Sequence, residues 1–123
     1  MENDKKAEME LNYLTAISPV DGRYARKTAA LAGYFSEFAL MKYRLYVEIE
    51  YFIALCGLPL GKNLIPETVN ADELRMIWRD FSMEDAMKIK EYEKTTNHDI
   101  KALEYFLKDK FDRAGMGMTK EFI

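Results

Sequence analysis

The chain has 123 residues, of which 49% are hydrophobic and 32% are charged, and its net charge at pH 7 is −3. This length suits one domain whose core needs no metal or disulfide, and the hydrophobic content excludes a disordered chain. The mildly acidic balance gives no general attraction for nucleic acid or for anionic membrane surfaces. We therefore expect neither as a partner.

The single cysteine, Cys56, cannot form a disulfide within the chain, and one histidine leaves no Cys/His cluster for zinc. Residues 1–10 are charged and lack the apolar stretch of a signal peptide, so we expect a flexible, solvated lead-in. The longest apolar run, 51–56, is too short to cross a bilayer. These features predict a cytoplasmic protein without a metal.

The next stretch, 11–24, is expected to be an extended arm rather than a helix. The Ser-Pro pair at 18–19 disfavours helical backbone, and the Asp-Gly pair at 21–22 is typical of a turn. We place that turn at 22–24. A brief helical turn is expected over 28–31, before Gly33.

Helical spacing dominates the rest of the chain. Ser36 is expected to cap a helix of five to six turns that ends at Gly57. Its apolar face has three- and four-residue spacing: Phe38, Met41, Leu45, Ile49, Phe52, Ile53 and Cys56. Asn70 and Ser82, each followed three residues later by an acid, predict two further helix starts. We expect Met83, Met87 and Tyr92 to continue the apolar stripe of these helices.

A last helix start is predicted at Thr96, which Asp99 follows three residues later. The apolar residues of this helix are Ile100, Leu103, Phe106, Leu107 and Phe111, and it should end before Gly115. No segment alternates like a strand, so we expect an all-α domain of four to five helices over 11–114. Residues 115–118 look flexible and apolar. We expect 115–123 to open a further segment that is cut off here.

Two local features favour an anionic ligand. His98 lies where the last helix is expected to begin, an end that presents free backbone N–H groups. The alternative is that Thr96 or Asn97 merely caps the helix while His98 faces water. Arg23, beside Tyr24 on the predicted turn, offers a planar fork to a phosphate or carboxylate. The alternative there is an ordinary solvated loop.

Two blocks resemble a known family. Residues 14–24 (LTAISPVDGRY) resemble the opening of the adenylosuccinate lyases, and residues 92–102 (YEKTTNHDIKA) resemble their first histidine region. Residues 104–107 continue the match. The resemblance runs from about 11 to 123. Lyases of this family belong to the fumarase/aspartase superfamily of all-α homotetramers, which implies that this chain is the family's N-terminal domain, without a cofactor.

The resemblance also implies a reaction. The family eliminates fumarate from adenylosuccinate, giving AMP, and from succinylaminoimidazole carboxamide ribotide (SAICAR), giving AICAR, in purine nucleotide biosynthesis. Arg23 and Tyr24 match positions at the nucleotide's phosphate and ribose end. His98 matches the first active-site histidine, and Asn97 and Asp99 match pocket residues beside it. The principal acid and base of the family lie outside this chain, so we expect it to be inactive alone.

Two other readings remain at this point. The chain could be a stand-alone helical module that binds a partner protein through its aromatic surface. It could also be part of another fumarate-releasing lyase, such as an argininosuccinate lyase. If the chain is an interaction module, replacing His98 with alanine should not affect its function. If it is part of a lyase, Arg23, Tyr24 and His98 should matter for function.

Overall fold

Regular structure is entirely helical in the part of the chain that the computed structural model describes, residues 9–117 and 119–122. No strand occurs among those residues, which confirms the all-α fold class. Most of the predicted lead-in, residues 1–8, lies outside the described residues, as do 118 and 123. The chain divides into two units, one up to Ser36 and one from Glu37 onward.

The first unit consists of turns followed by short helical pieces. Residues 12–24 form successive turns, and then come α1 (Ala25–Thr28), a 3-10 turn (Ala29–Leu31) and α2 (Ala32–Phe35). The predicted helical turn over 28–31 is thus part of a longer, interrupted helical stretch. That stretch continues through Gly33 and ends at Ser36, whose backbone is extended.

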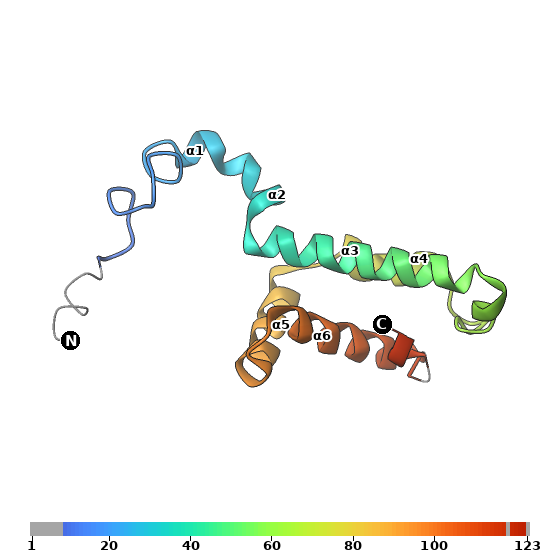
Figure 1. The fold of residues 1–123 in the computed structure, drawn as a ribbon. Coiled ribbons are helices and arrows are strands. Elements are labelled where there is room, and N and C mark those ends of the chain that lie inside the picture. The colour runs from blue at the N-terminus through green and yellow to red at the C-terminus, as the bar shows by residue number, and fades with distance from the viewer. Residues whose placement is uncertain (1–8, 118, 123) are drawn as a thin grey trace. The chain divides into compact units, whose positions relative to one another are not determined.

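The second unit begins with α3 (Glu37–Cys56), the longest helix of the chain, as Figure 1 shows. Its 20 residues agree with the predicted five to six turns. The apolar stripe read from the sequence faces the core: Met41, Leu45, Ile49 and Phe52 are buried, and Phe38, Ile53 and Cys56 pack against them. A 3-10 turn (Pro59–Gly61) follows the helix. The sequence pattern therefore predicted this helix and its buried face correctly.

Three shorter helices complete the second unit: α4 (Ala71–Arg79), α5 (Met83–Thr96) and α6 (Asp99–Arg113). Helix α4 packs along α3, and α5 and α6 pack against each other as a pair (Figure 1). Asn70 caps α4 by accepting a hydrogen bond from the Glu73 N–H at 2.9 Å. At the start of α5, the Ser82 hydroxyl and the Asp85 carboxylate each accept the other residue's N–H at 3.1 Å. Both predicted caps are confirmed.

The apolar stripe predicted for α5 is wrong in part. Met83 and Met87 are 63% and 65% exposed, whereas Ala86 and Ile89 are buried in the core. Tyr92 does pack against the core, as predicted. In α6 the predicted face is buried except for Ile100, which is 53% exposed. The first turn of α6 therefore lies outside the core, and burial begins at Ala102.

The stretch after α6 is anchored rather than flexible. Gly115 has a φ of +80°, which suits glycine, and it reverses the chain after the helix. The Met116 N–H then donates to the Phe111 carbonyl at 2.8 Å, and the Met116 side chain is 1% exposed. The expectation of a flexible stretch is therefore wrong for 115–117. A 3-10 turn (Lys120–Phe122) follows.

None of the helices in the described part of the chain is long and apolar enough to cross a membrane.

Candidate functional site

The corner between α5 and α6 carries the predicted histidine. Helix α5 runs on through Thr96, so the predicted helix start at that residue is wrong. Asn97 ends α5 with a left-handed backbone (φ 52°), and its N–H donates to the Glu93 carbonyl at 2.8 Å. Asparagine tolerates this conformation better than most residues. It is the one non-glycine residue with positive φ in the described ranges. Helix α6 therefore begins two residues later, at Asp99.

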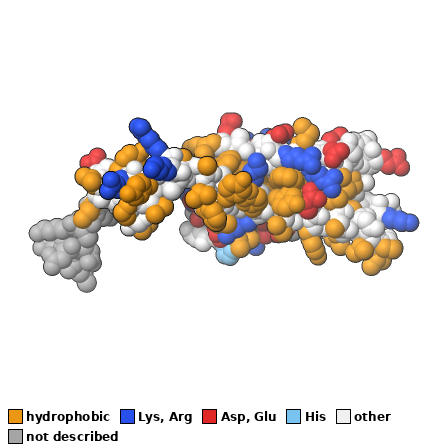
Figure 2. Space-filling model, turned by 90° about the horizontal axis from the view of Figure 1, so that it is seen from above, with side chains coloured by type: hydrophobic (Ala, Val, Ile, Leu, Met, Phe, Trp, Pro, Cys, Tyr) orange, Lys and Arg blue, Asp and Glu red, His pale blue; other side chains and the backbone are white. Residues whose placement is uncertain are grey.

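His98 itself caps α6. Its Nδ1 accepts a hydrogen bond from the Lys101 N–H at 3.2 Å, the role that the sequence assigned to Thr96 or Asn97. An accepting Nδ1 carries no proton, so the neutral ring bears its proton on Nε2. The side chain is 60% exposed, and Figure 2 shows the histidine, in pale blue, at the surface. Its Nε2–H is thus available to donate a hydrogen bond to a ligand.

The backbone donors at this helix end are largely taken. The Ile100 N–H donates to the Asp99 carboxylate at 2.8 Å, and the Lys101 N–H donates to His98. The Asp99 carboxylate also places negative charge at the helix N-terminus, where it is stabilised by the helix dipole. An anionic ligand would therefore meet side-chain donors here, rather than the free backbone N–H groups that the sequence suggested.

Asp99 is held by a residue that sequence reasoning missed. The Arg44 guanidinium, on α3, donates from Nη1 to Asp99 Oδ2 at 2.9 Å. This hydrogen bond and that from the Ile100 N–H hold the pKa of the Asp99 carboxyl below its ordinary value. Arg44 and Asp99 are 55 residues apart in sequence, and no local pattern points from one to the other.

The lowered pKa of Asp99 predicts a pH-dependent stability. Because the folded state favours the carboxylate, its contribution is present at pH 7 and is lost as pH falls through the lowered pKa. We expect Asp99→Asn to unfold at a lower urea concentration than the parent at pH 7. The difference between the urea midpoints of the variant and the parent should become smaller as the pH falls from about 5 to about 2. A difference that stays constant over this range would contradict the prediction.

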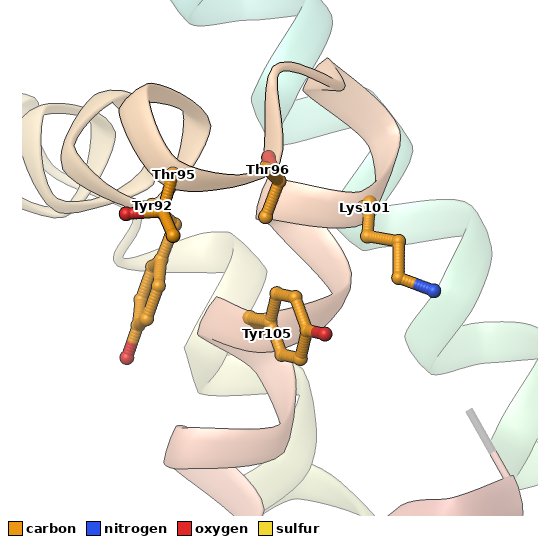
Figure 3. A pocket seen from close by; sticks show the side chains of 5 residues that line it. All are labelled: Tyr92, Thr95, Thr96, Lys101 and Tyr105. Atoms are coloured by element: carbon orange, nitrogen blue, oxygen red, sulfur yellow. The ribbon is translucent and has the colours of Figure 1, made fainter.

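A pocket of about 520 Å³ lies between the end of α5 and the first half of α6. Its lining residues are Tyr92, Thr95, Thr96, Lys101 and Tyr105, and in the view of Figure 3 the Tyr105 ring lies between the Tyr92 ring and the Lys101 side chain. The ring centroids are 6.2 Å apart. Aromatic walls with one ammonium group suit an aromatic or apolar anion. The pocket shares residues 96 and 101 with the histidine corner.

The second predicted site lies in the first unit. Gly22 is buried, and a Cβ there would lie 2.4 Å from the Tyr13 carbonyl oxygen, so the turn requires glycine. The Ala25 N–H donates to the Gly22 carbonyl at 2.9 Å and closes the predicted turn over Arg23 and Tyr24. The Arg23 guanidinium lies 5.0 Å from the Tyr24 ring centroid, which orients the fork by a cation–π contact.

The predicted site residues thus fall in two groups. Asn97, His98 and Asp99 share the α5–α6 corner of the second unit, and Arg23 and Tyr24 share the turn of the first unit. Each group is held by contacts within its own unit. In the described residues no cluster of three or more His, Cys, Asp or Glu side chains is arranged to hold a metal ion.

Comparison with known proteins shows close relatives for most of the chain. It is 55% identical over 104 residues to the adenylosuccinate lyase of Dictyostelium discoideum, which covers 83% of this chain and 22% of that protein. It is 52% identical over 108 residues to the enzyme of Legionella pneumophila (84% and 23%). For Escherichia coli the identity is 50% over 103 residues (83% and 23%). The chain thus spans about a quarter of the length of these relatives. No protein-family model matches it.

Proposed function

From the homology of this chain to part of adenylosuccinate lyase, we propose that it forms the N-terminal domain of such a lyase. The full-length enzyme would eliminate fumarate from adenylosuccinate, giving AMP, and from SAICAR, giving AICAR, in the cytoplasm. The observation that carries the proposal is the identity of about half the residues to proteins of that name. An exposed histidine, held at a helix corner through a hydrogen bond to its Nδ1, supports it.

The chemistry divides between this chain and the rest of the enzyme. A β-elimination needs a base for the proton next to a carboxylate and an acid for the departing nitrogen. We assign His98 a hydrogen-bonding or proton-moving role at the substrate, and Asn97 and Asp99 places beside it. Arg23 and Tyr24 would hold the phosphate and ribose end. The principal acid and base would come from the rest of the enzyme, so the chain alone would be inactive.

A chimaera tests this proposal. The matching 103-residue stretch of the Escherichia coli enzyme is replaced by the corresponding stretch of this chain. We expect the chimaera to release fumarate from both adenylosuccinate and SAICAR, and the 123-residue chain alone to release none. A folded, assembled chimaera without activity on either substrate would overturn the proposed function. Turnover by the chain alone would overturn the division of the active site.

A homotetramer would give the exposed apolar stripe of α3 a partner. This stripe consists of Leu40, Tyr43, Val47 and Tyr51, with exposed fractions from 44% to 64%. Figure 2 shows hydrophobic side chains, in orange, gathered between charged ones on the face seen from above. Exposed apolar surface of this kind marks an interaction site more often than chance. We propose that the stripe is covered in the assembled enzyme.

This proposal predicts that the isolated chain associates as its concentration rises. Sedimentation velocity should show a rising average mass, and Val47→Lys should shift the association to higher concentration, because a charge in the stripe resists burial. Leu60→Lys is the matched control, since Leu60 is 100% exposed and lies outside the stripe. A parent chain that stays monomeric at high concentration would contradict the prediction.

A further inference from the structure

The first turn of α6 has little packing to hold it. Asp99, Ile100 and Lys101 are all exposed, and the first buried residues of the helix, Ala102 and Leu103, come after them. Helix ends without buried contacts fray readily. The His98 cap depends on this turn, because its Nδ1 accepts from the Lys101 N–H. The His98 backbone is held from α5, because the Thr96 hydroxyl accepts its N–H at 3.2 Å and donates to its carbonyl at 3.0 Å. The imidazole cap, in contrast, depends on the exposed turn.

An ion pair from α3 ties this turn to the rest of the unit, beside Ile100, which lines a groove together with residues of α3. Asp99 uses both carboxylate oxygens: Oδ1 accepts from the Ile100 N–H and Oδ2 accepts from Arg44 Nη1. Asp99 thus links the start of α6 to the middle of α3. Because one oxygen fixes the backbone of the first turn and the other fixes the turn to α3, the carboxylate cannot move without disturbing both.

Arg44 is itself placed by its surroundings. Its side chain is 33% exposed and lines a groove of about 320 Å³ between α3 and α6, with Leu40, Val47, Ile100 and Leu103 among the apolar residues around it. The Asp99 carboxylate is 53% exposed, so the pair lies at the surface and its effect on overall stability is small; its role is local, at the first turn of α6. The following residue, Leu45, is fully buried, which fixes the backbone of α3 at this point.

We propose that Arg44 is a positioning residue for His98. Through Asp99 it keeps the first turn of α6 formed, so that the imidazole remains the helix cap with Nδ1 accepting and Nε2–H directed to a ligand. The inference rests on the proposed function only for the role of His98 at the substrate. The hydrogen bonds that link Arg44, Asp99 and the first turn of α6 are independent of the reaction. Without Arg44 the turn frays, Nδ1 loses the Lys101 N–H, and the ring turns freely.

The single histidine allows a direct test in the chain as it is, by nuclear magnetic resonance. Two readouts are followed in Arg44→Gln: the hydrogen exchange of the Lys101 amide, and the ¹⁵N shifts of the ring at a pH where it is neutral. We expect exchange to become about fivefold faster, the effect of losing a typical cap. The share of the ring with its proton on Nδ1 should rise. Arg44→Lys keeps one donor and should restore both readouts.

Arg75→Gln is the matched control. Arg75 is 29% exposed and donates to Glu50 of α3 at 2.8 Å, so it joins two helices as Arg44 does, but its ion-pair partners, Glu50 and Asp72, lie on α3 and α4 and not on α6. It should lower stability without moving either readout. Asp99→Asn breaks the same ion pair from its other partner and should change both readouts as Arg44→Gln does. It provides a second test of the proposal if the Arg44→Gln variant does not fold.

The proposal is overturned if Arg44→Gln leaves both readouts at parent values, or if Arg75→Gln moves them equally. Neither measurement uses a substrate, so this outcome is separate from an inactive chimaera.

Discussion

Replacing Phe111 with alanine is expected to lower the free energy of unfolding by about 3–5 kcal/mol. The Phe111 ring is fully buried near the end of α6 and meets the Phe52 ring of α3 edge-on, with centroids 5.0 Å apart. The change removes apolar burial and this aromatic contact, and it leaves a cavity that the helices cannot close. Domains of this kind are stable by about 5–15 kcal/mol, so the variant should lose much of its stability.

Urea denaturation followed by far-UV circular dichroism measures this loss. Phe111→Leu keeps most of the volume and should cost clearly less than the alanine variant. Met87→Ala is the control, because Met87 is 65% exposed on α5 and its loss should change stability by less than about 0.5 kcal/mol. If Phe111→Ala cost no more than Met87→Ala, the packing of α6 on α3 described above would be wrong.

Replacing His98 with asparagine should lower the activity of the assembled enzyme strongly while leaving the fold intact. Asparagine is among the best N-cap residues, and its amide oxygen can accept the Lys101 N–H in place of the imidazole. It cannot move a proton near neutral pH. In the active chimaera we expect His98→Asn to lower kcat by at least about 100-fold, the contribution of a proton-transferring group. In the isolated chain its stability should match the parent.

His98→Ala provides the comparison that separates the capping role of the histidine from its proposed role at the substrate. It removes the cap as well as the imidazole, so it should cost about 1 kcal/mol of stability in the isolated chain in addition to the activity in the chimaera. A chimaera that kept its activity with His98→Asn would show that the imidazole serves only as a cap, and the role assigned to His98 would be wrong.

The sequence predicted the fold correctly where the apolar residues allowed only one buried face. The spacing along α3 identified its buried face because the apolar residues form a single long stripe, and the caps at Asn70 and Ser82 follow from local hydrogen bonds. In α5 two faces compete. Met83 with Met87 and Ala86 with Ile89 both fit helical spacing, so the spacing alone does not decide which pair is buried. Packing chose the smaller pair, since α6 lies close against α5 at that face.

The site was predicted less completely than the fold. The position of His98 at a helix start follows from the local sequence, but histidine is not a preferred N-cap, so Thr96 and Asn97 took precedence. Which residue caps α6 depends on which residue ends α5 with a left-handed backbone, here Asn97. That depends on how the two helices pack and not on the local sequence alone. Arg44 was missed because an ion pair across 55 residues leaves no local signal. The functional role of Arg23 was inferred from the family resemblance, because a turn of this kind is common and does not by itself indicate a binding site.

The left-handed Asn97 and the capping His98 also constrain how the sequence can drift. The backbone at 97 admits asparagine or glycine with little strain, and position 98 favours side chains that accept a hydrogen bond from the first turn. Other residues at these two positions would make the corner between α5 and α6 less stable, by about 1 kcal/mol for loss of the cap. A substitution at position 97 therefore acts through the fold, whereas exchange of His98 for another capping residue preserves the corner and removes only the imidazole.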